Sequence, residues 1–568
     1  MAKRKAIKTY ERNRDPALSP EPLKIFISTV PFLAGVYYEW ASGIVCMFLL
    51  AYLWYCRRRT GRILIFRSEI LLAAAVLAAA YGISILWAVD PGAAAFGFVK
   101  FLPLPVFVLA LGQLEKEQRT GLLDMVPLSG AVMTAVSWGL GQFPLLNSYL
   151  IVNHRLAGFF QYPNTFALYL LVGIIVLLSK EKWQKRSVCL LLILFLGIGL
   201  TGSRTGFILT AATLICYAVW IKDRRVRTGL CGLLICSVTA VGIYVLVTGN
   251  VSSVGRYFTT SLSSSTFVGR LLYFKDAIPV ILKHPLGLGY MGYYFTQGRF
   301  QTGVYAVRNI HNELLQLLLD IGWLPAGILI WAVITGIRRG NRKNRMIILV
   351  IALHSALDFN LQFLVIFFLL LAAIDLNEKS RKEFTKKKVF AAGSVIAGCV
   401  SLYFGAASIL DYLKLYPAAV QIYPGNTNAW MELLKAAEDV EEMEQTADRI
   451  REINPENPLA NNAKARAAYS RVDFGNMIRY KEEALEYYKY NLAEYLDYFD
   501  MLYVGYQLYI ENHDLASAEI CAECMRGIPE TLAEISEATD PLAYQINDKP
   551  QLDLPETYEE ILRQIGTD

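Results

Sequence analysis

Long apolar segments alternate with short polar breaks over roughly the first 410 residues of the chain. Most of these segments are about 16–22 residues long, close to the ~20 residues that a helix needs to cross the hydrocarbon core of a bilayer. The pattern predicts an all-α, polytopic membrane helix bundle of about 12–13 spans. The expected spans lie near residues 22–38, 40–56, 68–88, 97–112, 120–142, 165–179, 187–201, 205–221, 229–247, 313–336, 345–357, 359–376 and 389–408.

Charge divides the chain into two parts. Of 568 residues, 55% are hydrophobic and only 18% are charged, which is too apolar for an ordinary soluble protein. After residue 410 we count 13 Lys and Arg but 31 Asp and Glu, which leaves 42 basic and 18 acidic residues before it. A basic membrane domain therefore precedes an acidic tail, and the net charge of +6 does not indicate a nucleic-acid partner.

The basic breaks between the apolar segments predict the orientation in the membrane. They fall at residues 3–5, 57–59, 180–186, 222–227, 338–345 and 379–388. All six lie on the same side of the predicted bundle, and cytoplasmic loops carry the excess of Lys and Arg. We therefore expect a cytoplasmic N-terminus, a long outer loop at 248–312 and an extracytoplasmic C-terminal domain. No small-residue cleavage site follows the first apolar run, which reads as an uncleaved span.

Three domains follow from this layout. Residues 1–20 form a cytoplasmic basic tail, 21–408 the membrane domain and 409–568 a helical domain rich in Ala, Leu, Glu and Tyr. The segments 423–426 and 454–457 are similar and lie 31 residues apart, close to the tetratricopeptide period of about 34 residues. The expected helix pairs are 427–440 with 443–453 and 459–470 with 476–490.

Two features of this C-terminal domain leave alternatives open. Its acidic surface is either simply solvated or a docking platform for a protein or a cationic polymer. Cys521 and Cys524 stand one helical turn apart, but two further zinc ligands of suitable spacing are missing nearby. We expect both cysteines to be buried helix residues rather than a metal or redox site.

Isolated arginines on the predicted outer side oppose the orientation rule. An ionisable group at the end of a span is by default a functional hypothesis. Arg204 joins two spans almost without a loop, so an unpaired charge there indicates a bound anion or an acidic partner. The arginines of this outer set are Arg155, Arg204, Arg256, Arg270, Arg299 and Arg308.

Histidines gather on the same side. His311 precedes Asn312 and Glu313 where a span begins, and a histidine with a carboxylate can perform acid–base chemistry there. His284 lies before a Gly-rich turn. His354 and Asp358 lie at an outward bend, where a buried His–Asp pair bracing the bundle is the leading interpretation and a supporting role in a site is the alternative.

The segment 154–164 leads into another span and has two interpretations. It gathers Arg155, Tyr162 and Asn164, which are a guanidinium, an aromatic ring and an amide. Such a segment is either an interfacial belt with an arginine that reaches the headgroups, or part of a site.

Arginines with a histidine suggest chemistry on a diphosphate. The planar guanidinium makes two charge-assisted bonds to phosphate oxygens. No acidic cluster stands on the outer side to hold a metal, so the sequence favours a metal-free site without a cofactor. The outer compartment lacks ATP and nucleotide sugars, so a transferase there needs a donor activated in advance, such as a lipid-linked diphosphate sugar.

These motifs together resemble the O-antigen ligase/polymerase superfamily of bacterial lipid-linked glycan ligases and polymerases. The resemblance covers roughly residues 20–378, and the helical-repeat tail resembles that of the longer members. It rests on residues 155–164, 202–206, 269–270, 284–289, 311–316 with Asp320 and Gly322, and 354–359.

The resemblance implies an enzyme of the bacterial cytoplasmic membrane that works on the outer face of the bilayer. It would transfer a glycan from an undecaprenyl-diphosphate carrier to an acceptor hydroxyl, without metal and with inversion at the anomeric carbon. The acceptor is a glycan, a lipid or a protein, and the tail could bind a protein partner. The shorter ligases lack this acidic tail, which leaves the acceptor open.

The resemblance also implies residue roles. His311 would be the base or would orient the acceptor. Arg204 and Arg270 would hold the diphosphate as leaving group, with Arg155 as a third cation. Asn312 and Glu313 would orient His311 or the incoming sugar. Tyr162, Asn164, His284, His354 and Asp358 would support the site, and no nucleic acid would bind.

Three other functions remain as alternatives. A glycan polymerase shares the chemistry but uses a lipid-linked acceptor. A transporter of lipid-linked glycan predicts polar residues at mid-membrane and two related halves, and no convincing internal repeat is present. A membrane anchor with a scaffolding tail leaves the outer arginines and His311 without a role.

Overall fold

The computed structural model describes residues 18–181, 184–220, 228–229, 232 and 265–565. Most of the predicted span 229–247 lies outside the described residues. Arg256 and the basic segments 3–5 and 222–227 lie outside them as well.

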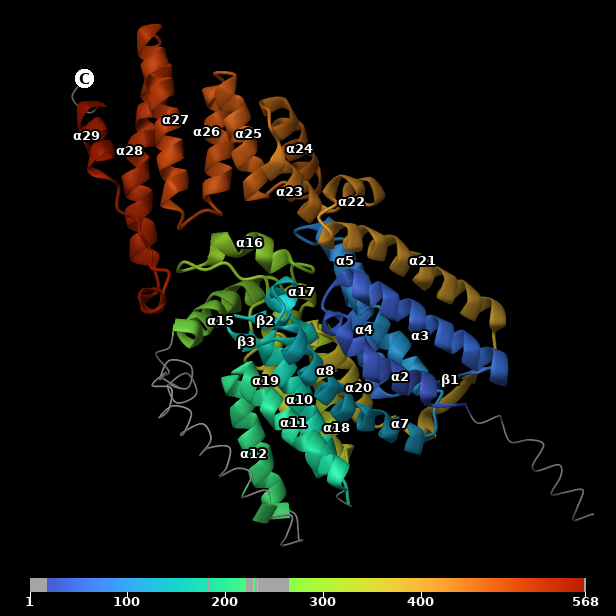
Figure 1. Cartoon of the computed structure of the whole chain (residues 1–568). Helices are drawn as coiled ribbons and strands as arrows, with labels where there is room; N and C mark the ends of the chain where they lie inside the picture. The colour runs from blue at the N-terminus through green and yellow to red at the C-terminus, as the bar shows by residue number, and fades with distance from the viewer. Residues whose placement is uncertain (1–17, 182–183, 221–227, 230–231, 233–264, 566–568) are drawn as a thin grey trace, which may run out of the picture.

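Helices make up almost all of the membrane domain, which confirms the predicted all-α bundle (Figure 1). The α-helices of its first half are α2 (Glu21–Thr29), α3 (Glu39–Thr60), α4 (Glu69–Ser84), α5 (Pro91–Phe101), α6 (Pro103–Leu111), α7 (Lys116–Leu122), α8 (Val126–Leu140), α9 (Pro144–Leu150), α10 (Pro163–Leu178), α11 (Lys185–Thr201) and α12 (Arg204–Trp220). Those of its second half are α15 (Ser265–Lys283), α16 (Gly292–Phe300), α17 (Glu313–Ile321), α18 (Trp323–Arg339), α19 (Arg342–Ser355), α20 (Leu364–Ala373) and α21 (Lys387–Tyr412). Short 3-10 helices in the described part of the chain connect some of them or extend the tail: η1 (Val30–Phe32), η2 (Ala34–Val36), η3 (Leu123–Met125), η4 (Gly158–Phe160), η5 (Asn360–Gln362), η6 (Glu378–Ser380) and η7 (Pro541–Gln545).

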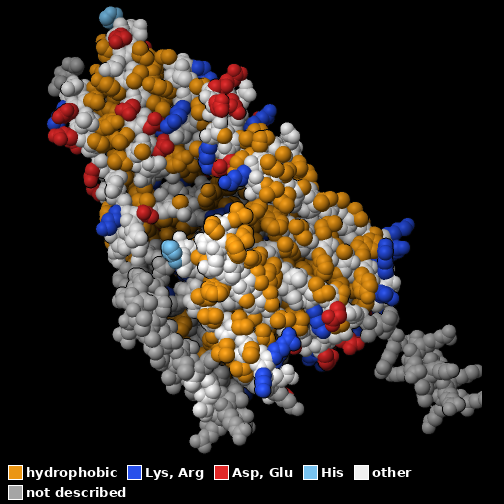
Figure 2. Space-filling view, in the orientation of Figure 1, with side chains coloured by type: hydrophobic (Ala, Val, Ile, Leu, Met, Phe, Trp, Pro, Cys, Tyr) orange, Lys and Arg blue, Asp and Glu red, His pale blue; other side chains and the backbone are white. Residues whose placement is uncertain are grey.

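Among the described residues, four helical segments are long and apolar enough to cross a membrane. They are 39–60, 91–111, 116–140 and 387–412. Shorter apolar helices at 69–84, 163–178, 204–220 and 364–373 lie beside them. Large hydrophobic side chains remain exposed around the domain (Figure 2), for example Leu145 at 87% and Leu86 at 83%. In a soluble protein such surface would mark an interaction site, and here it suits lipid.

Two predicted spans are broken rather than continuous. The expected span 22–38 is divided into α2 and two 3-10 turns, and Gly35 inside the second turn adopts a positive φ of 61°. The expected span 313–336 is divided into α17 and α18 at Gly322, whose φ is 79°. Hydrophobicity does not reveal these breaks because the residues on both sides remain apolar.

Short strand pairs also occur, which the sequence analysis did not predict. β1 (Ile63–Phe66) pairs antiparallel with β4 (Arg381–Phe384). This pair joins two of the predicted basic loops, and Arg339 bonds Glu69 at 2.7 Å beside them. The described basic segments 57–59 and 180–181 follow the last turns of α3 and α10, while residues 155–164 lead into the first turn of α10. A second pair, β2 (Ile151–Val152) with β3 (Arg155–Leu156), forms there.

The tail is a row of antiparallel helices (Figure 1). The two predicted helix pairs match α23–α24 and α25–α26 within a few residues, and α27 and α28 form a third pair. Cys521 and Cys524 lie in α28 without a disulfide, one buried and one partly buried. The tail helices are α22 (Tyr416–Ile422), α23 (Thr427–Ala436), α24 (Val440–Ile453), α25 (Pro458–Ser470), α26 (Phe474–Leu485), α27 (Leu492–Glu511), α28 (Leu515–Ala538) and α29 (Glu556–Ile565).

Asp90 connects the tail to the membrane domain. Its buried carboxylate accepts the main-chain N–H of Ala93 at 2.8 Å and so caps α5. The same carboxylate accepts hydrogen bonds from Thr427 Oγ1 at 3.0 Å and Asn454 Nδ2 at 3.5 Å. Thr427 directly follows the segment 423–426 and Asn454 begins the segment 454–457, so the two similar segments meet at one side chain.

Replacing Asp90 by Ala should loosen this contact. The loss of one helix cap and two side-chain hydrogen bonds should cost about 2–3 kcal/mol. Limited proteolysis of the full-length protein should then release the tail faster than in the wild type. Asp473→Ala is the matched control, because Asp473 caps α26 inside the tail and is exposed. Equal cleavage of the two variants would contradict the role of Asp90.

Candidate functional site

His311 stands immediately before α17 in a strained main-chain conformation. Its φ is 54°, an uncommon value for a residue with a side chain. Asn312 follows as the N-cap, and its side chain accepts the N–H of Leu315 at 3.1 Å. Asn312 Nδ2 also donates to the carbonyl of Ala356 at 3.0 Å. The start of α17 is thus tied to the bend after α19.

That bend carries Asp358, which faces His311. The His311 Nδ1 atom lies 3.2 Å from Asp358 Oδ1. The His311 side chain is 24% exposed and the Asp358 side chain is 2% exposed. The rings of Phe359 and His311 pack edge to face at 5.0 Å. A buried carboxylate therefore orients an imidazole that solvent or substrate can reach.

Asp358 binds further groups from two other segments. Tyr162 donates to Oδ1 at 2.8 Å, and Asn164 Nδ2 donates to Oδ2 at 2.8 Å. Arg270 Nη2 lies 3.6 Å from Oδ2, and Arg270 Nη1 donates to the neighbouring carbonyl of Leu357 at 2.5 Å. The structure thus brings Arg270 of α15, Tyr162 and Asn164 at the start of α10, and His311 before α17 to the bend that carries Asp358.

The surroundings determine the charge of Asp358, which lies in the bend outside the membrane-spanning helices. Burial opposes ionisation of the carboxyl. The hydrogen bond with His311 and the positive charge of Arg270 outweigh that cost and hold the pKa of Asp358 below its ordinary range. The carboxylate stays charged at neutral pH and favours a proton on His311 Nδ1, which leaves Nε2 free to accept one.

Arg155 and Arg204 lie near this network but differ in their contacts. Arg155 Nη2 donates to Asn164 Oδ1 at 2.6 Å, and its Nε donates to the carbonyl of Thr201 at 2.7 Å. Because Thr201 ends α11 just before α12, these bonds place Arg204 at the same end of the bundle. Arg204 is half-buried, and its side chain makes no hydrogen bond or ion pair with the residues that the structure describes.

Glu313 does not touch His311. Its buried carboxylate accepts the N–H of Leu361 at 2.9 Å and the amide of Gln362 at 3.0 Å. Glu313 therefore fastens α17 to the segment that follows Asp358. Among the described contacts, the main chain alone connects Glu313 to His311.

His354 takes a different partner from the one expected. The leading interpretation paired it with Asp358, but its Nδ1 lies 2.9 Å from Asn360 Nδ2, and no hydrogen bond joins it to Asp358 among the described residues. Asn360 Oδ1 in turn accepts from Thr165 at 3.0 Å. The carboxylate of Asp358 does not bond His354, because four donors from other segments of the chain surround it.

His284 begins a turn that holds α17 in place. The main chain of Leu288 donates to the carbonyl of Leu319 at 2.6 Å, and Gly289 donates to that of Asp320 at 3.0 Å. Gly287 needs its positive φ of 79° here, since a Cβ atom would lie 2.5 Å from the carbonyl oxygen of Asp320. Among the described contacts, the His284 ring has no hydrogen bond to His311 or Asp358. The motif 284–289 thus positions the helix that follows His311.

A second polar cluster lies beside the site, and the sequence analysis missed it. Lys100 is 1% exposed and donates to Tyr290 OH at 3.1 Å, while that hydroxyl donates to Glu39 at 2.7 Å. The Lys100 ammonium and the Arg308 guanidinium both lie over the Tyr37 ring, at 4.6 and 5.8 Å. The presence of Lys100 inside an apolar predicted span was the sequence signal that could have revealed this cluster.

Comparison with known proteins supports part of the resemblance. Residues 189–332 match the family model described as O-antigen ligase. The match includes Arg204, Arg270, His284 and His311, whereas Asp358 lies beyond it. A search of curated proteins finds no match to the chain. The family match supports a membrane glycan ligase or polymerase in general.

Replacing Asp358 by Asn should destabilise the protein in a pH-dependent way. A carboxyl whose folded pKa is lowered stabilises the fold above its unfolded pKa of about 3.9, and this stabilisation is lost as the pH falls through the folded value. At pH 7 the variant should lose several kcal/mol. The difference from wild type should shrink below about pH 4, as measured by thermal unfolding of the detergent-solubilised protein.

The exposed Asp124 supplies the control for this measurement. Asp124→Asn should change stability by less than about 0.5 kcal/mol, as surface substitutions usually do. A loss in Asp358→Asn that stays constant from pH 7 to pH 3 would contradict a buried, ionised carboxylate.

Proposed function

We propose that this protein is a membrane glycosyltransferase of the outer face of the bacterial cytoplasmic membrane. It moves a glycan from an undecaprenyl-diphosphate carrier to an acceptor hydroxyl, without metal and with inversion at the anomeric carbon. The observation that carries this proposal is the His311–Asp358 pair with Arg270 on the same carboxylate. The O-antigen ligase match over residues 189–332 agrees with it.

His311 acts as the general base. Asp358 holds Nδ1, so the free Nε2 removes the proton from the acceptor hydroxyl while its oxygen attacks the anomeric carbon. This is the role that an imidazole performs best near neutral pH. The buried, charged Asp358 also stabilises the imidazolium that forms.

Two arginines have different tasks in this mechanism. Arg204 is half-buried without a described partner, so it binds the diphosphate and stabilises the charge that develops on the leaving group. Arg270 Nη1 donates a hydrogen bond to the carbonyl of Leu357, while its buried Nε has no hydrogen-bond partner among the described residues. Arg270 therefore joins the diphosphate to the His311–Asp358 pair. Arg155 is more firmly tied to Asn164 and Thr201, and it shapes the site.

A glycan polymerase is the second candidate, because it would use the same groups on a lipid-linked acceptor. The family match favours ligase and polymerase equally. Product length separates them, since a ligase transfers preformed chains and a polymerase lengthens them.

His311→Ala should abolish transfer. A general base contributes about 10²–10⁴-fold to the rate, and no other imidazole contacts Asp358 by a hydrogen bond among the described residues. The assay combines purified protein in vesicles with an undecaprenyl-diphosphate oligosaccharide and follows both lipid and glycan products. His513→Ala is the control, since His513 is exposed in the tail.

Two results of this assay would change the proposal. Full transfer by His311→Ala would exclude His311 as the base. Movement of the intact donor across the vesicle membrane, with no bond broken, would favour a transporter.

Arg204→Lys should lose most of the activity although the charge remains. An ammonium cannot reproduce the two parallel bonds of a guanidinium to a diphosphate, so we expect at least a roughly tenfold loss of kcat, or about 1.4 kcal/mol. Arg338→Lys, an exposed change at the opposite end of the bundle, should leave turnover unchanged. Wild-type turnover by Arg204→Lys would show that Arg204 has only a structural role.

A further inference from the structure

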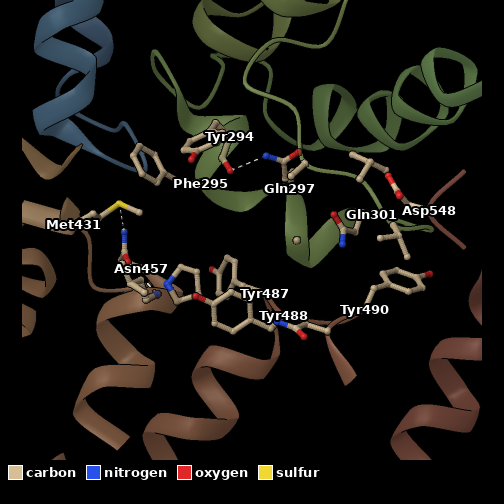
Figure 3. A pocket seen from close by; sticks show the side chains of 17 residues that line it. Tyr294, Phe295, Gln297, Gln301, Met431, Asn457, Tyr487, Tyr488, Tyr490 and Asp548 are labelled. Carbon is tan, nitrogen blue, oxygen red and sulfur yellow. Dashed lines mark hydrogen bonds between the residues drawn. The ribbon is translucent and has the colours of Figure 1, made fainter. Parts of the chain in front are cut away.

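A cavity of about 640 Å³ lies between α16 and the tail (Figure 3). Tyr294, Phe295 and Gln297 line it from α16, while Asn457 and Tyr488 line it from the tail. Figure 3 shows these two sets of side chains on opposite walls of the opening. The wall on each side thus combines aromatic rings with side-chain amides.

A second cavity of about 740 Å³ continues along the same helix toward the membrane domain. Tyr294, Phe295 and Ala306 line both cavities. The second cavity also reaches Glu39 and Arg308, which belong to the polar cluster around Lys100. We call the two cavities together the interdomain groove, and Figure 2 shows a recess between the tail and the membrane domain.

The interdomain groove approaches His311 from two directions. Tyr305 lines the first cavity and packs against Tyr273 at 4.6 Å, and the Tyr273 ring lies 6.5 Å from that of His311. On the other route Arg308 lines the second cavity and lies over Tyr37. The Tyr37 ring is 6.4 Å from Phe359, which packs on His311. Only one or two side chains separate each cavity from the proposed base.

The lining suits a saccharide chain better than other ligands. Flat aromatic rings pack against the apolar C–H faces of sugar rings, while amides and carboxylates bond hydroxyl groups in fixed directions. The first cavity carries Gln301 and the exposed Asn491 with its tyrosines, whereas the amides of Gln297 and Asn457 are bonded within the protein. The second carries Asn426 and Asn428 among other polar groups. A peptide that binds by strand addition would need an open strand edge, and the described residues of these walls belong to helices and loops.

We infer that the interdomain groove binds several sugar units of a glycan chain and directs its reactive end toward His311. This inference rests on the proposed function, because it supplies a site for the long substrate of that reaction. The chain comes either from the lipid-linked donor or from the acceptor, and the same chemistry recognises both. In this arrangement the tail is one wall of the substrate site.

Binding of free glycan tests the groove without any reaction. The probe is the oligosaccharide that mild acid releases from the lipid carrier, fractionated from one to six repeat units. Saturation-transfer NMR with the full-length protein in nanodiscs should show contact with the longer fractions in the wild type and in His311→Ala. The contact should weaken markedly in Tyr294→Ala, whose side chain is 38% exposed and lines both cavities.

Matched variants separate recognition from folding. Tyr544 is also exposed, at 47%, and lies outside both linings, so Tyr544→Ala should keep full contact. Tyr294→Trp should retain binding because it keeps a flat ring. Equal contact in Tyr294→Ala and wild type would overturn the inference. Contact with a random peptide mixture but none with glycan would overturn it as well.

Turnover then identifies the source of the chain. In the wild type, KM should fall as the substrate that occupies the groove becomes longer. Tyr294→Ala should raise KM for long chains roughly three- to tenfold with kcat unchanged, as expected for the loss of one aromatic contact. Assays that lengthen only the donor or only the acceptor then show which substrate occupies the groove. For that substrate, KM should no longer depend on chain length in Tyr294→Ala. If neither substrate loses its length dependence in the variant, the groove proposal fails, while His311-dependent transfer of short chains still supports the proposed enzyme.

Discussion

The buried carboxylate of Asp358 is the interaction on which the proposed site depends. An unpaired charge at such a position costs several kcal/mol. Hydrogen bonds from Tyr162, Asn164 and His311, together with the nearby Arg270, offset that cost. The donors come from segments far apart in the chain, so satisfying one carboxylate holds those segments together.

The same principle joins the two domains. Asp90 accepts hydrogen bonds from Thr427 and Asn454 of the tail while it caps α5. At the far end of the tail, Asp540 pairs with Lys275 of α15, the helix that also carries Arg270. These contacts are made at both ends of the interdomain groove. A tail fixed at two points can serve as a wall of defined shape, which a flexible appendage could not.

Strain and close packing then give the histidine its position. His311 adopts a positive φ, and such strain persists only where the surroundings fix it. Glu313 fastens the first turn of α17 on one side, and the turn at 284–289 holds its last turn on the other. A helix of nine residues would be marginal alone, so these contacts define where the imidazole stands.

The sequence by itself determined the helical membrane domain, the acidic tail and the residue types of the site. Apolar length and charge are local properties, so α3, α10 and α21 were predictable, as were Arg270 and His311 as candidates. Only the tertiary structure decided that Asp358 pairs with His311 instead of His354, and that Lys100, Glu39 and Tyr290 form a cluster. Partner choice depends on which donors packing brings within about 3 Å, and spacing along the chain does not encode that.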